Sequence, residues 1–425
     1  MAAIELKYAA GKQRGQVPWP AAWLSPKLLS AAEPTALIAA ALRQPIGCPP
    51  LEQIIKPQES VLIVTSDITR YTGSEIYLPI LVAELNRIGV VDEQISILIA
   101  LGIHRSQTVE EHRKILGPLY GRIAVFDHDC DNPGQLVELG RTDNGLPVSI
   151  NRRAVEADRL IVTGTVGFHY FAGFGGGRKG LVPGIAGRET CMQSHFTVFN
   201  PPAIGGKHPR ATTGLLEGNP VHQTLLQAAR LAKPDFLLNT VLSPQKELLG
   251  VFCGDLEQAH LAGCELVRDL FQVPLAQAAD LAIISCGGEP KDINFIQSQK
   301  ALDYGCRAVR EGGTIILLAA CRDGFGNATF YDWFKYQDLD EFERALRADY
   351  QINGQTALTT LSKARRFRVI LVSEFSAGQT ARMGMEKAAE LSSAIELARA
   401  DLPAEPTVVV IPDGGTVLPI VEKTV

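Results

Sequence analysis

The chain has 425 residues, more than one ordinary domain needs, so two or three domains are expected. Its net charge of −5, with 46% hydrophobic and 20% charged residues, indicates a globular protein with a large core and argues against a nucleic acid or an anionic membrane as partner. The first residues, MAAIELKYAAGKQRG, contain no apolar run behind a basic start, and no stretch approaches the roughly 20 apolar residues of a membrane span. We therefore expect neither a signal peptide nor a transmembrane helix.

Short apolar runs alternate with amphipathic stretches in the first part of the chain. Apolar residues at helical spacing, from Leu78 to Ile88, predict a helix between the first two strands. Thr108 and Glu111 form a capping box for a second helix that runs through Leu116. The strands predicted in this part are 60–65, 95–101, 122–126 and 159–163.

The same alternation restarts after about residue 275. The predicted strands are 280–285, 314–319, 368–372 and 407–411, and the predicted helices cover 293–310, 341–346 and 385–400. Asp292 is expected to cap the first of these helices. Strand–helix alternation with near-continuous apolar strands is typical of parallel sheets covered on both faces, so we predict an α/β fold of two α/β domains with mainly parallel sheets.

The domain boundary is expected between residues 272 and 273. Residues 1–272 form an N-terminal α/β domain, residues 273–403 form a C-terminal α/β domain, and residues 404–425 are a C-terminal segment that can return to the N-terminal domain. Ligands of open α/β sheets bind beyond the carboxyl ends of the strands. Polar clusters follow three strands of the first domain and one of the second, which predicts an active site between the domains: SDITR, GIHR, TGTVGFHYFAGFGGGRKG and CGGEPKDINFIQSQK.

The glycine loop is the most distinctive of these clusters. Gly175, Gly176 and Gly177 allow positive φ and a close approach of backbone N–H groups to a ligand. Arg178 and Lys179 add charge suited to a phosphate or a carboxylate. The loop fits neither a Walker A motif nor a GxGxxG motif followed by a helix. A mobile surface turn is the alternative, and it is weakened by four aromatic residues that a solvated loop would not carry: Phe168, Tyr170, Phe171 and Phe174.

Two histidines stand at predicted strand ends, His104 in GIHR and His169 at the start of the glycine loop. Histidine titrates near neutrality, so the pair can serve as acid and base on opposite faces of a substrate, although a structural role is the competing interpretation. His195 is expected on a helix, as a core residue or a metal ligand. The remaining histidines are interpreted as solvated or structural: His112, His128, His208, His222 and His260.

Two further pairs of polar residues are candidates for substrate or cofactor contacts. Asp67 and Arg70 lie in the turn after the first strand, where Arg70 can hold a carboxylate or the two residues can only fix the turn. Gln297 and Lys300 are spaced i, i+3 and so share one face of a predicted helix, which can also be an ordinary solvated face.

Taken together, these motifs resemble the lactate racemase family, the nickel-pincer-nucleotide-dependent 2-hydroxyacid racemases and epimerases. The resemblance covers most of the chain, in order, and rests on DITR (67–70), GIHR (102–105), HYFAGFGGGRKG (169–180), the PGIAGRE that follows with His195, and QSQK (297–300). It implies two α/β domains with the site between them.

The resemblance also implies a role for each matching residue. His104 and His169 occupy the places of the two acid–base residues, Lys179 that of the lysine joined to the cofactor through a thioamide, and His195 that of the nickel ligand. Arg70, Gln297 and Lys300 match residues that approach the substrate. The remaining matches are expected at the cofactor: Asp67, Gly175, Gly176, Gly177 and Arg178, the last of which can instead brace the loop.

The implied activity is racemisation or epimerisation of a 2-hydroxy acid, lactate or a larger one, by proton-coupled hydride transfer. The implied cofactor is nickel pyridinium-3,5-bisthiocarboxylate mononucleotide, attached at Lys179, supplied by cofactor-maturation enzymes and absent when these are not co-expressed. One histidine takes the hydroxyl proton while the C2 hydride moves to the cofactor, and the second returns a proton on the other face. The oligomeric state is left open.

The sequence departs from the family pattern at a few positions. The family often has proline after the DxTR arginine, where this chain has Tyr71, and Trp333 is the only downstream candidate for a tryptophan that some members use near the substrate. These departures leave the choice of 2-hydroxy acid open. Two alternatives remain: an NAD-dependent dehydrogenase or other phosphate-cofactor enzyme, and a non-enzymatic protein that binds a sugar acid or a nucleotide.

The eight cysteines are scattered, and none forms a CxxC pair, so neither a zinc ribbon nor an iron–sulfur site is predicted. Isolated cysteines in a chain of this size indicate reduced, mostly buried thiols and a cytoplasmic location. The positions are Cys48, Cys130, Cys191, Cys253, Cys264, Cys286, Cys306 and Cys321.

Overall fold

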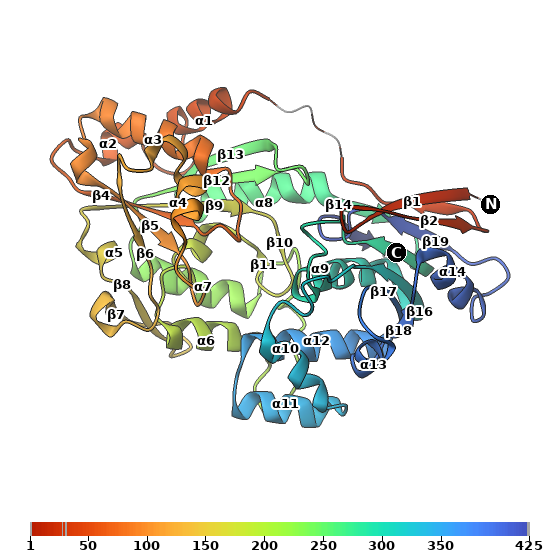
Figure 1. The fold of residues 1–425 in the computed structure, drawn as a ribbon. Helices are drawn as coiled ribbons and strands as arrows, with labels where there is room; N and C mark the ends of the chain where they lie inside the picture. The colour runs from red at the N-terminus through yellow and green to blue at the C-terminus, as the bar shows by residue number, and fades with distance from the viewer. Residues whose placement is uncertain (1, 28, 30–31, 423–425) are drawn as a thin grey trace. The chain divides into compact units, whose positions relative to one another are not determined.

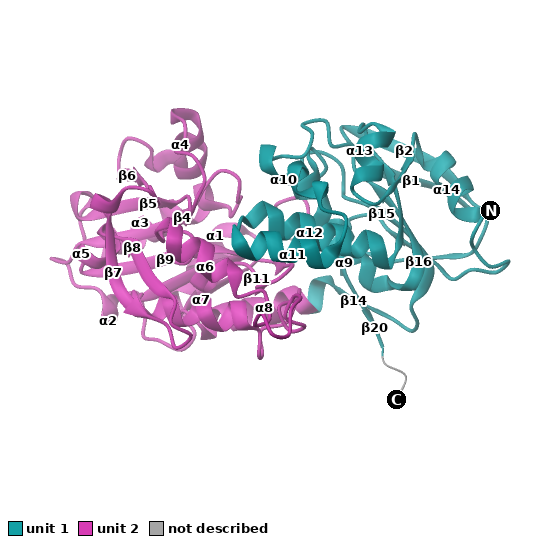
Figure 2. Cartoon of the chain, turned by 90° about the horizontal axis from the view of Figure 1, so that it is seen from below, with its two compact units in different colours: residues 1–27, 269–425 teal, residues 28–268 magenta. Residues whose placement is uncertain are grey.

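The computed structural model describes residues 2–27, 29 and 32–422 (Figure 1). The chain divides into two compact units (Figure 2): unit 1 comprises Met1–Lys27 and Asp269–Val425, and unit 2 comprises Leu28–Arg268. Each unit is built around a six-stranded sheet that is wholly or mainly parallel, with helices in the connections. The predicted α/β class is therefore confirmed.

The sheet of unit 2 is parallel except at one edge, where β13 runs antiparallel to β12. Its central strands bury nearly every residue, which explains why they were recognisable as continuous apolar runs. The strand order is β13 (Leu248–Gly254), β12 (Phe236–Leu242), β9 (Arg159–Val166), β4 (Val61–Ser66), β5 (Ile95–Ala100) and β6 (Ala124–Asp127).

Helices of unit 2 cover this sheet. A core cluster joins α1 (Pro34–Arg43) and α3 (Ser74–Ile88) to the strands, with Tyr77 and Leu81 among its fully buried members. The helix α4 (Val109–Leu116) begins with the predicted capping box, in which the Glu111 N–H donates to Thr108 Oγ1 at 3.2 Å. Three further helices belong to this unit: α6 (Arg188–Phe196), α7 (Pro220–Leu231) and most of α8 (Gln258–Phe271).

The strand order of unit 2 creates a switch point between β4 and β9. From β4 the chain proceeds to β5 and β6 on one side, and then continues with β9 and β12 on the other side of β4. The segments that leave the carboxyl ends of β4 and β9 therefore turn away in opposite directions, and such switch points are where open α/β sheets bind ligands. Asp67 directly follows β4, and the glycine loop follows β9.

The sheet of unit 1 is parallel throughout. Its strand order is β18 (Glu386–Ala388), β17 (Arg368–Val372), β16 (Val309–Leu318), β15 (Ala279–Ser285), β19 (Val408–Ile411) and β3 (Ala21–Trp23). The unit also contains the hairpin of β1 (Ala2–Tyr8) and β2 (Gly11–Val17) and the helices α9 (Phe295–Gly305), α10 (Ala328–Asp332), α11 (Leu339–Ala348), α12 (Ile352–Arg366), α13 (Ala377–Arg382) and α14 (Leu391–Arg399).

Strand pairing corrects the expected domain assignment at both ends of the chain. Residues 1–27 were placed in the N-terminal domain, but β3 pairs with β19 in the sheet of unit 1. The segment 404–425 was expected to be able to return to that domain, but β19 pairs with β15, and β20 (Leu418–Val421) pairs with β14 (Gln272–Leu275). The reason is that β19 is buried along its whole length and needs a neighbouring strand on each side.

Two predicted helices of unit 1 are shorter than expected. The segment 385–400 contains β18 before α14, because an edge strand pairs with β17 before Glu390 starts the helix. The segment 293–310 is helical only through Gly305. The cap of this helix is Asn294 and not Asp292, since Asn294 Oδ1 accepts the Gln297 N–H at 3.1 Å while Asp292 accepts the Ala9 N–H at 2.8 Å.

The thiols agree with the expectation from their spacing. All eight cysteines are free, and seven of them are buried. Within the described part of the chain, no helix is long and apolar enough to cross a membrane. The cytoplasmic location stays a prediction.

Candidate active site

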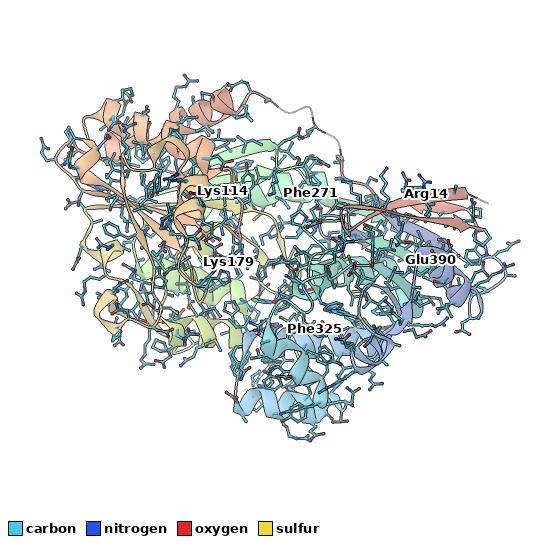
Figure 3. The ribbon with its side chains drawn as sticks, viewed as in Figure 1. Arg14, Lys114, Lys179, Phe271, Phe325 and Glu390 are labelled. Carbon is cyan, nitrogen blue, oxygen red and sulfur yellow. The ribbon has the colours of Figure 1, made fainter. Side chains whose placement is uncertain are left out.

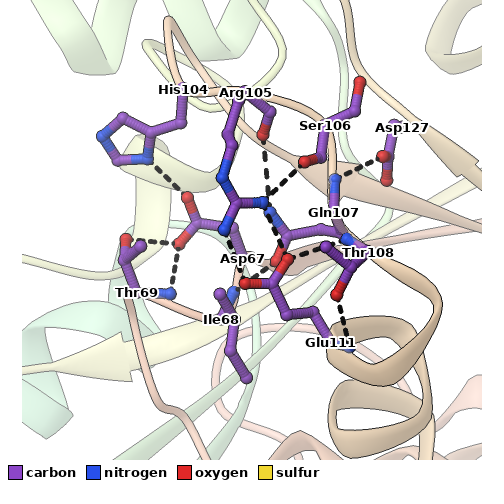
Figure 4. Close-up of polar contacts among 10 residues, drawn as sticks. All are labelled: Asp67, Ile68, Thr69, His104, Arg105, Ser106, Gln107, Thr108, Glu111 and Asp127. Atoms are coloured by element: carbon purple, nitrogen blue, oxygen red, sulfur yellow. Dashed lines mark hydrogen bonds and ion pairs between the residues drawn. The ribbon is translucent and has the colours of Figure 1, made fainter.

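A buried carboxylate holds the first predicted histidine (Figure 4). Asp67 is only 2% exposed, and its Oδ2 lies 2.5 Å from Nδ1 of His104. Its Oδ1 accepts hydrogen bonds from the N–H and the hydroxyl of Thr69, at 3.0 and 2.7 Å. Because a carboxylate only accepts, Nδ1 of His104 carries the proton of the pair, and the neutral ring has its lone pair on Nε2.

The surroundings of Asp67 keep it ionised. Burial by itself raises the pKa of Asp67, but hydrogen bonds from His104 and Thr69, together with the charge of Arg70, hold the pKa below its ordinary value. The carboxylate therefore fixes the orientation of the His104 ring, whose side chain is 42% exposed. The predicted proximity of Asp67 and the GIHR segment is present in the structure.

Arg70 provides an unpaired cation beside this pair. Its backbone N–H closes the turn onto the Asp67 carbonyl at 3.0 Å, and its side chain is exposed. Among the described residues, no carboxylate forms an ion pair with the Arg70 guanidinium. Its charge lowers the pKa values of both Lys179 and His195, so it lies near both. The next residue, Tyr71, donates its hydroxyl to Glu75 at 2.7 Å.

The backbone of the glycine loop demands glycine at two positions. Gly176 has φ 71° and Gly177 has φ 53°, in the left-handed region. A Cβ on Gly176 would lie 2.8 Å from the Thr165 carbonyl oxygen, and a Cβ on Gly177 would lie 2.7 Å from the His260 ring. At Gly175 the nearest atom to such a Cβ would be 3.6 Å away, so this glycine has room for a side chain.

Arg178 points back into the protein and braces the loop. Its Nη2 donates to the carbonyls of Ala172 and Phe174, at 2.9 and 3.1 Å, and its Nη1 lies 3.0 Å from His260 Nε2. The residue is 1% exposed, and burial lowers the pKa of Arg178 to about 10. Of the two roles considered for Arg178, these contacts fit the brace. His260 was assigned no special role in the sequence, and its position 82 residues away gave no signal of this contact.

Lys179 faces the second predicted histidine. Its Nζ lies 3.2 Å from Nε2 of His169, and Nδ1 of that ring accepts the Ala172 N–H at 3.3 Å. Burial lowers the pKa of Lys179 well below its ordinary value, and the charges of Arg178 and Arg70 lower it further. Figure 3 labels Lys179, which lies on the short turn of helix after β11 (Gly173–Phe174).

The ring of Phe171 connects three of the predicted site residues. Its centroid is 4.5 Å from that of His169 and 5.3 Å from that of His195, and Lys179 Nζ is 5.7 Å away. Phe171 is 1% exposed. The sequence indicated only that an aromatic residue here argues against a solvated loop. The structure shows that Phe171 brings His169, Lys179 and His195 together.

His195 lies near the end of α6, as the predicted helix requires. Its Nδ1 donates to the Cys191 carbonyl one turn earlier, at 2.8 Å. The lone pair is therefore on Nε2, and burial is the main cause that lowers the pKa of His195 to about 4. A neutral imidazole with a fixed tautomer is the form in which histidine binds a metal. No group of three or more His, Cys, Asp or Glu side chains in the described ranges is arranged to hold a metal ion.

The remaining predicted site residues belong to unit 1. Lys300 donates to Gln297 Oε1 at 2.8 Å across one face of α9, as their spacing predicted. Their link to the residues of unit 2 stays a prediction. Trp333 is packed inside unit 1, where it stacks on Phe342 at 5.7 Å and donates to Gln351 at 3.3 Å.

The fold consists of two α/β units, and unit 2 carries a histidine in each of the segments that follow β5 and β9. Models of the lactate racemase N-terminal domain and the lactate racemase C-terminal domain match residues 16–205 and 275–419. A lactate racemase from Thermoanaerobacterium thermosaccharolyticum is 35% identical, over 90% of this chain and 89% of its own. A lactate racemase from Lactiplantibacillus plantarum is 37% identical, over 88% of each chain. The chain therefore belongs to the lactate racemase family and is an isomerase.

Solved structures agree with this assignment. The lactate racemase apoprotein from T. thermosaccharolyticum superposes with a TM-score of 0.90 at 32% identity, over 99% of this chain and 100% of that one. A protein from Thermotoga maritima matches with a TM-score of 0.66 at 20% identity, over 93% of this chain and 100% of that one, and so shares the fold.

Proposed function

We propose that the chain interconverts the stereoisomers of a 2-hydroxy acid, lactate or a larger relative, with a lysine-tethered nickel-pincer nucleotide. When bound, this cofactor supplies a site that accepts hydride from C2 of the substrate and returns it. The observation that carries the proposal is that two histidines of one unit are held in opposite tautomers, within a chain of the lactate racemase family.

The tautomers follow from the hydrogen bonds. Asp67 holds the proton on Nδ1 of His104, so Nε2 of the neutral ring can accept a proton from the substrate hydroxyl. The Ala172 N–H donates to Nδ1 of His169, so the proton of that neutral ring is on Nε2. One neutral ring thus presents a proton acceptor and the other an N–H that donates a hydrogen bond, and inversion needs one acid–base group on each face of the substrate.

The residues of this chain fit the cofactor. Lys179 offers an amine whose pKa burial lowers well below its ordinary value, and His195 offers a buried Nε2 lone pair for nickel. Gly176 and Gly177 are packed against Thr165 and His260 of the protein itself, so their expected contact with the cofactor stays a prediction. Asp67 was expected to bind the cofactor, but we assign it to His104 instead, since both carboxylate oxygens are already engaged. Loading by maturation enzymes stays a prediction.

Arg70 is the proposed anchor for the substrate carboxylate. Its guanidinium is exposed, and its charge is felt at Lys179 and His195. We propose Gln297 and Lys300 as further contacts of the substrate. The position of the active site between the two domains stays a prediction. Tyr71, in place of the proline frequent in the family, is the residue at which we expect the choice of substrate to differ.

Both alternatives are less well supported than the racemase. A dehydrogenase or other phosphate-cofactor enzyme would use the glycine loop for a phosphate, but Arg178 is turned inward onto loop carbonyls. A non-enzymatic binding function does not explain why His104 and His169 are held in opposite tautomers.

The test is a racemisation assay with the chain co-expressed with cofactor-maturation enzymes. Single enantiomers of lactate, malate, phenyllactate and aldonates are incubated with the protein, and optical activity is followed. We expect at least one of them to racemise, or to epimerise in the case of an aldonate. Ligand-dependent stabilisation without any loss of stereochemical purity would instead indicate a binding protein.

A further inference from the structure

The amine of Lys179 meets the His169 ring in a geometry that an uncharged amine satisfies. Nδ1 of His169 accepts the Ala172 N–H, so the neutral ring carries its proton on Nε2, the atom 3.2 Å from Lys179 Nζ. Only a lone pair on Nζ can accept that proton. An ammonium group would place two donors against each other.

The other groups around Lys179 favour the same state. Arg178 and Arg70 repel a positive charge on Nζ, and the titratable neighbours of Lys179 also include His169, His195 and Cys191. In the described part of the chain, no Asp or Glu forms an ion pair with Lys179. Lys363 shows the contrast: it is 8% exposed, but a carboxylate, Asp303, lies 2.7 Å from its Nζ.

We infer that Lys179 of the chain without cofactor is a carbonyl-reactive amine, held uncharged by His169 and open to covalent capture of small aldehydes. The inference concerns the protein before any cofactor is attached and does not depend on the proposed function. An ordinary lysine, with a pKa of about 10.4, has under about 0.1% of its amine uncharged at pH 7, so a free amine here reacts selectively. Lys179 as a residue is partly buried, and the smallest aldehyde, formaldehyde, makes the least demand on access to its amine.

The chemistry balances with the aldehyde as the only added reactant. The Nζ lone pair forms a bond to the carbonyl carbon, and the nitrogen, now positively charged, passes a proton to the oxygen anion to give a carbinolamine. Both protons of the water that is lost afterwards come from the amine nitrogen. Loss of water, formed from the carbonyl oxygen and two protons, leaves a C=N bond to Lys179. No oxidant or reductant takes part in this step.

The test uses the full chain expressed without maturation enzymes. It is treated at pH 7 with formaldehyde or with pyridoxal 5′-phosphate, each with cyanoborohydride to fix the imine, and the modified lysines are identified by peptide mass. We expect Lys179 to be modified more than about tenfold faster than Lys363 or the exposed Lys56, because the pKa of Lys179 lies well below its ordinary value. Pyridoxal 5′-phosphate is large, so a slow reaction with it could reflect limited access to Lys179. Formaldehyde is small enough to exclude this explanation.

Two variants give the test its specificity. His169→Gln should slow modification of Lys179 by about tenfold, because the amine can then take up a proton, whereas His208→Gln should leave it unchanged. Thermal unfolding measurements check that both variants are folded. The comparison of Lys179 with Lys363 and Lys56 in the wild-type chain does not depend on either variant. If Lys179 reacts with formaldehyde no faster than Lys56 in the wild-type chain, the inference is wrong, whatever the racemisation assay shows.

Discussion

Asp67 Oδ2 and His104 Nδ1 lie 2.5 Å apart, with the carboxylate buried and the imidazole half-exposed. The pair couples the end of β4 to the loop after β5, two neighbouring parallel strands. Its consequence is chemical, because a fixed Nδ1–H leaves Nε2 of His104 as the basic atom. A second histidine, His169, is fixed the other way by a backbone N–H.

Replacing Asp67 by Asn should lower kcat by about 10²–10⁴, the range that a positioned acid–base group contributes. The amide can donate to Nδ1 and so favour the wrong tautomer of His104. Steady-state kinetics of the cofactor-loaded variant measures the effect, with KM changing little. Asp131→Asn is a matched control, because Asp131 is an exposed carboxylate paired with Arg188. A variant that kept the full rate would remove Asp67 from the positioning role.

Replacing either His104 or His169 by Ala should abolish racemisation, since inversion needs a proton acceptor and a proton donor on opposite faces. The loss should reach at least about 10²-fold for each. His112→Ala is the control, since His112 was assigned no role in the site and its Nε2 lies 2.8 Å from Asp127 Oδ1. Racemisation that continues unchanged in one of the two variants would exclude that histidine from proton transfer.

Gly177→Ala should destabilise the glycine loop, and Gly175→Ala should not. At Gly177 an alanine meets the His260 ring at 2.7 Å and has a left-handed backbone, which costs about 1–2 kcal/mol before the clash is counted. Thermal unfolding and the amount of cofactor bound to Lys179 report the difference. Equal behaviour of the two variants would show that the loop tolerates a side chain at both positions.

Glu59 should stabilise unit 2 in a pH-dependent way from the amino-terminal ends of the central strands β4 and β9. Bidentate hydrogen bonds from Arg159, at 2.6 and 2.7 Å, lower the pKa of Glu59 to about 2. A depressed pKa stabilises the fold above the unfolded value of about 4.3, and this contribution is lost as pH falls toward about 2. Glu59→Gln should therefore cost roughly 1–3 kcal/mol at pH 7. Denaturant unfolding of the two proteins should converge near pH 2, and a constant difference would contradict the account.

Local signals in the sequence predicted local structure well. The capping box of Thr108 and Glu111 and the apolar strands β4, β5 and β9 are properties of contiguous residues, and the structure has them. The edge strand β3 was not predicted, because three residues carry little pattern and its partner, β19, lies nearly 400 residues further along the chain.

The candidate site divides in the same way. The residue types at the strand ends could be recognised in the sequence. In the structure, Asp67 and His104 lie together because β4 and β5 are neighbouring parallel strands. The direction in which the Arg178 side chain points could not be predicted from the sequence. It depends on contacts with His260 and with loop carbonyls, which form only in the folded chain. The same holds for Phe171, whose contacts join residues from two segments.

The most direct test of the central claim is the intact mass and nickel content of the chain after co-expression with the maturation enzymes. Wild-type protein should carry a cofactor adduct on Lys179 and bind nickel. Lys179→Arg should lose the adduct. His195→Gln should keep the adduct and lose most of the nickel, because only its Nε2 lone pair is removed from the site. Wild-type protein with neither adduct nor nickel would contradict the claim.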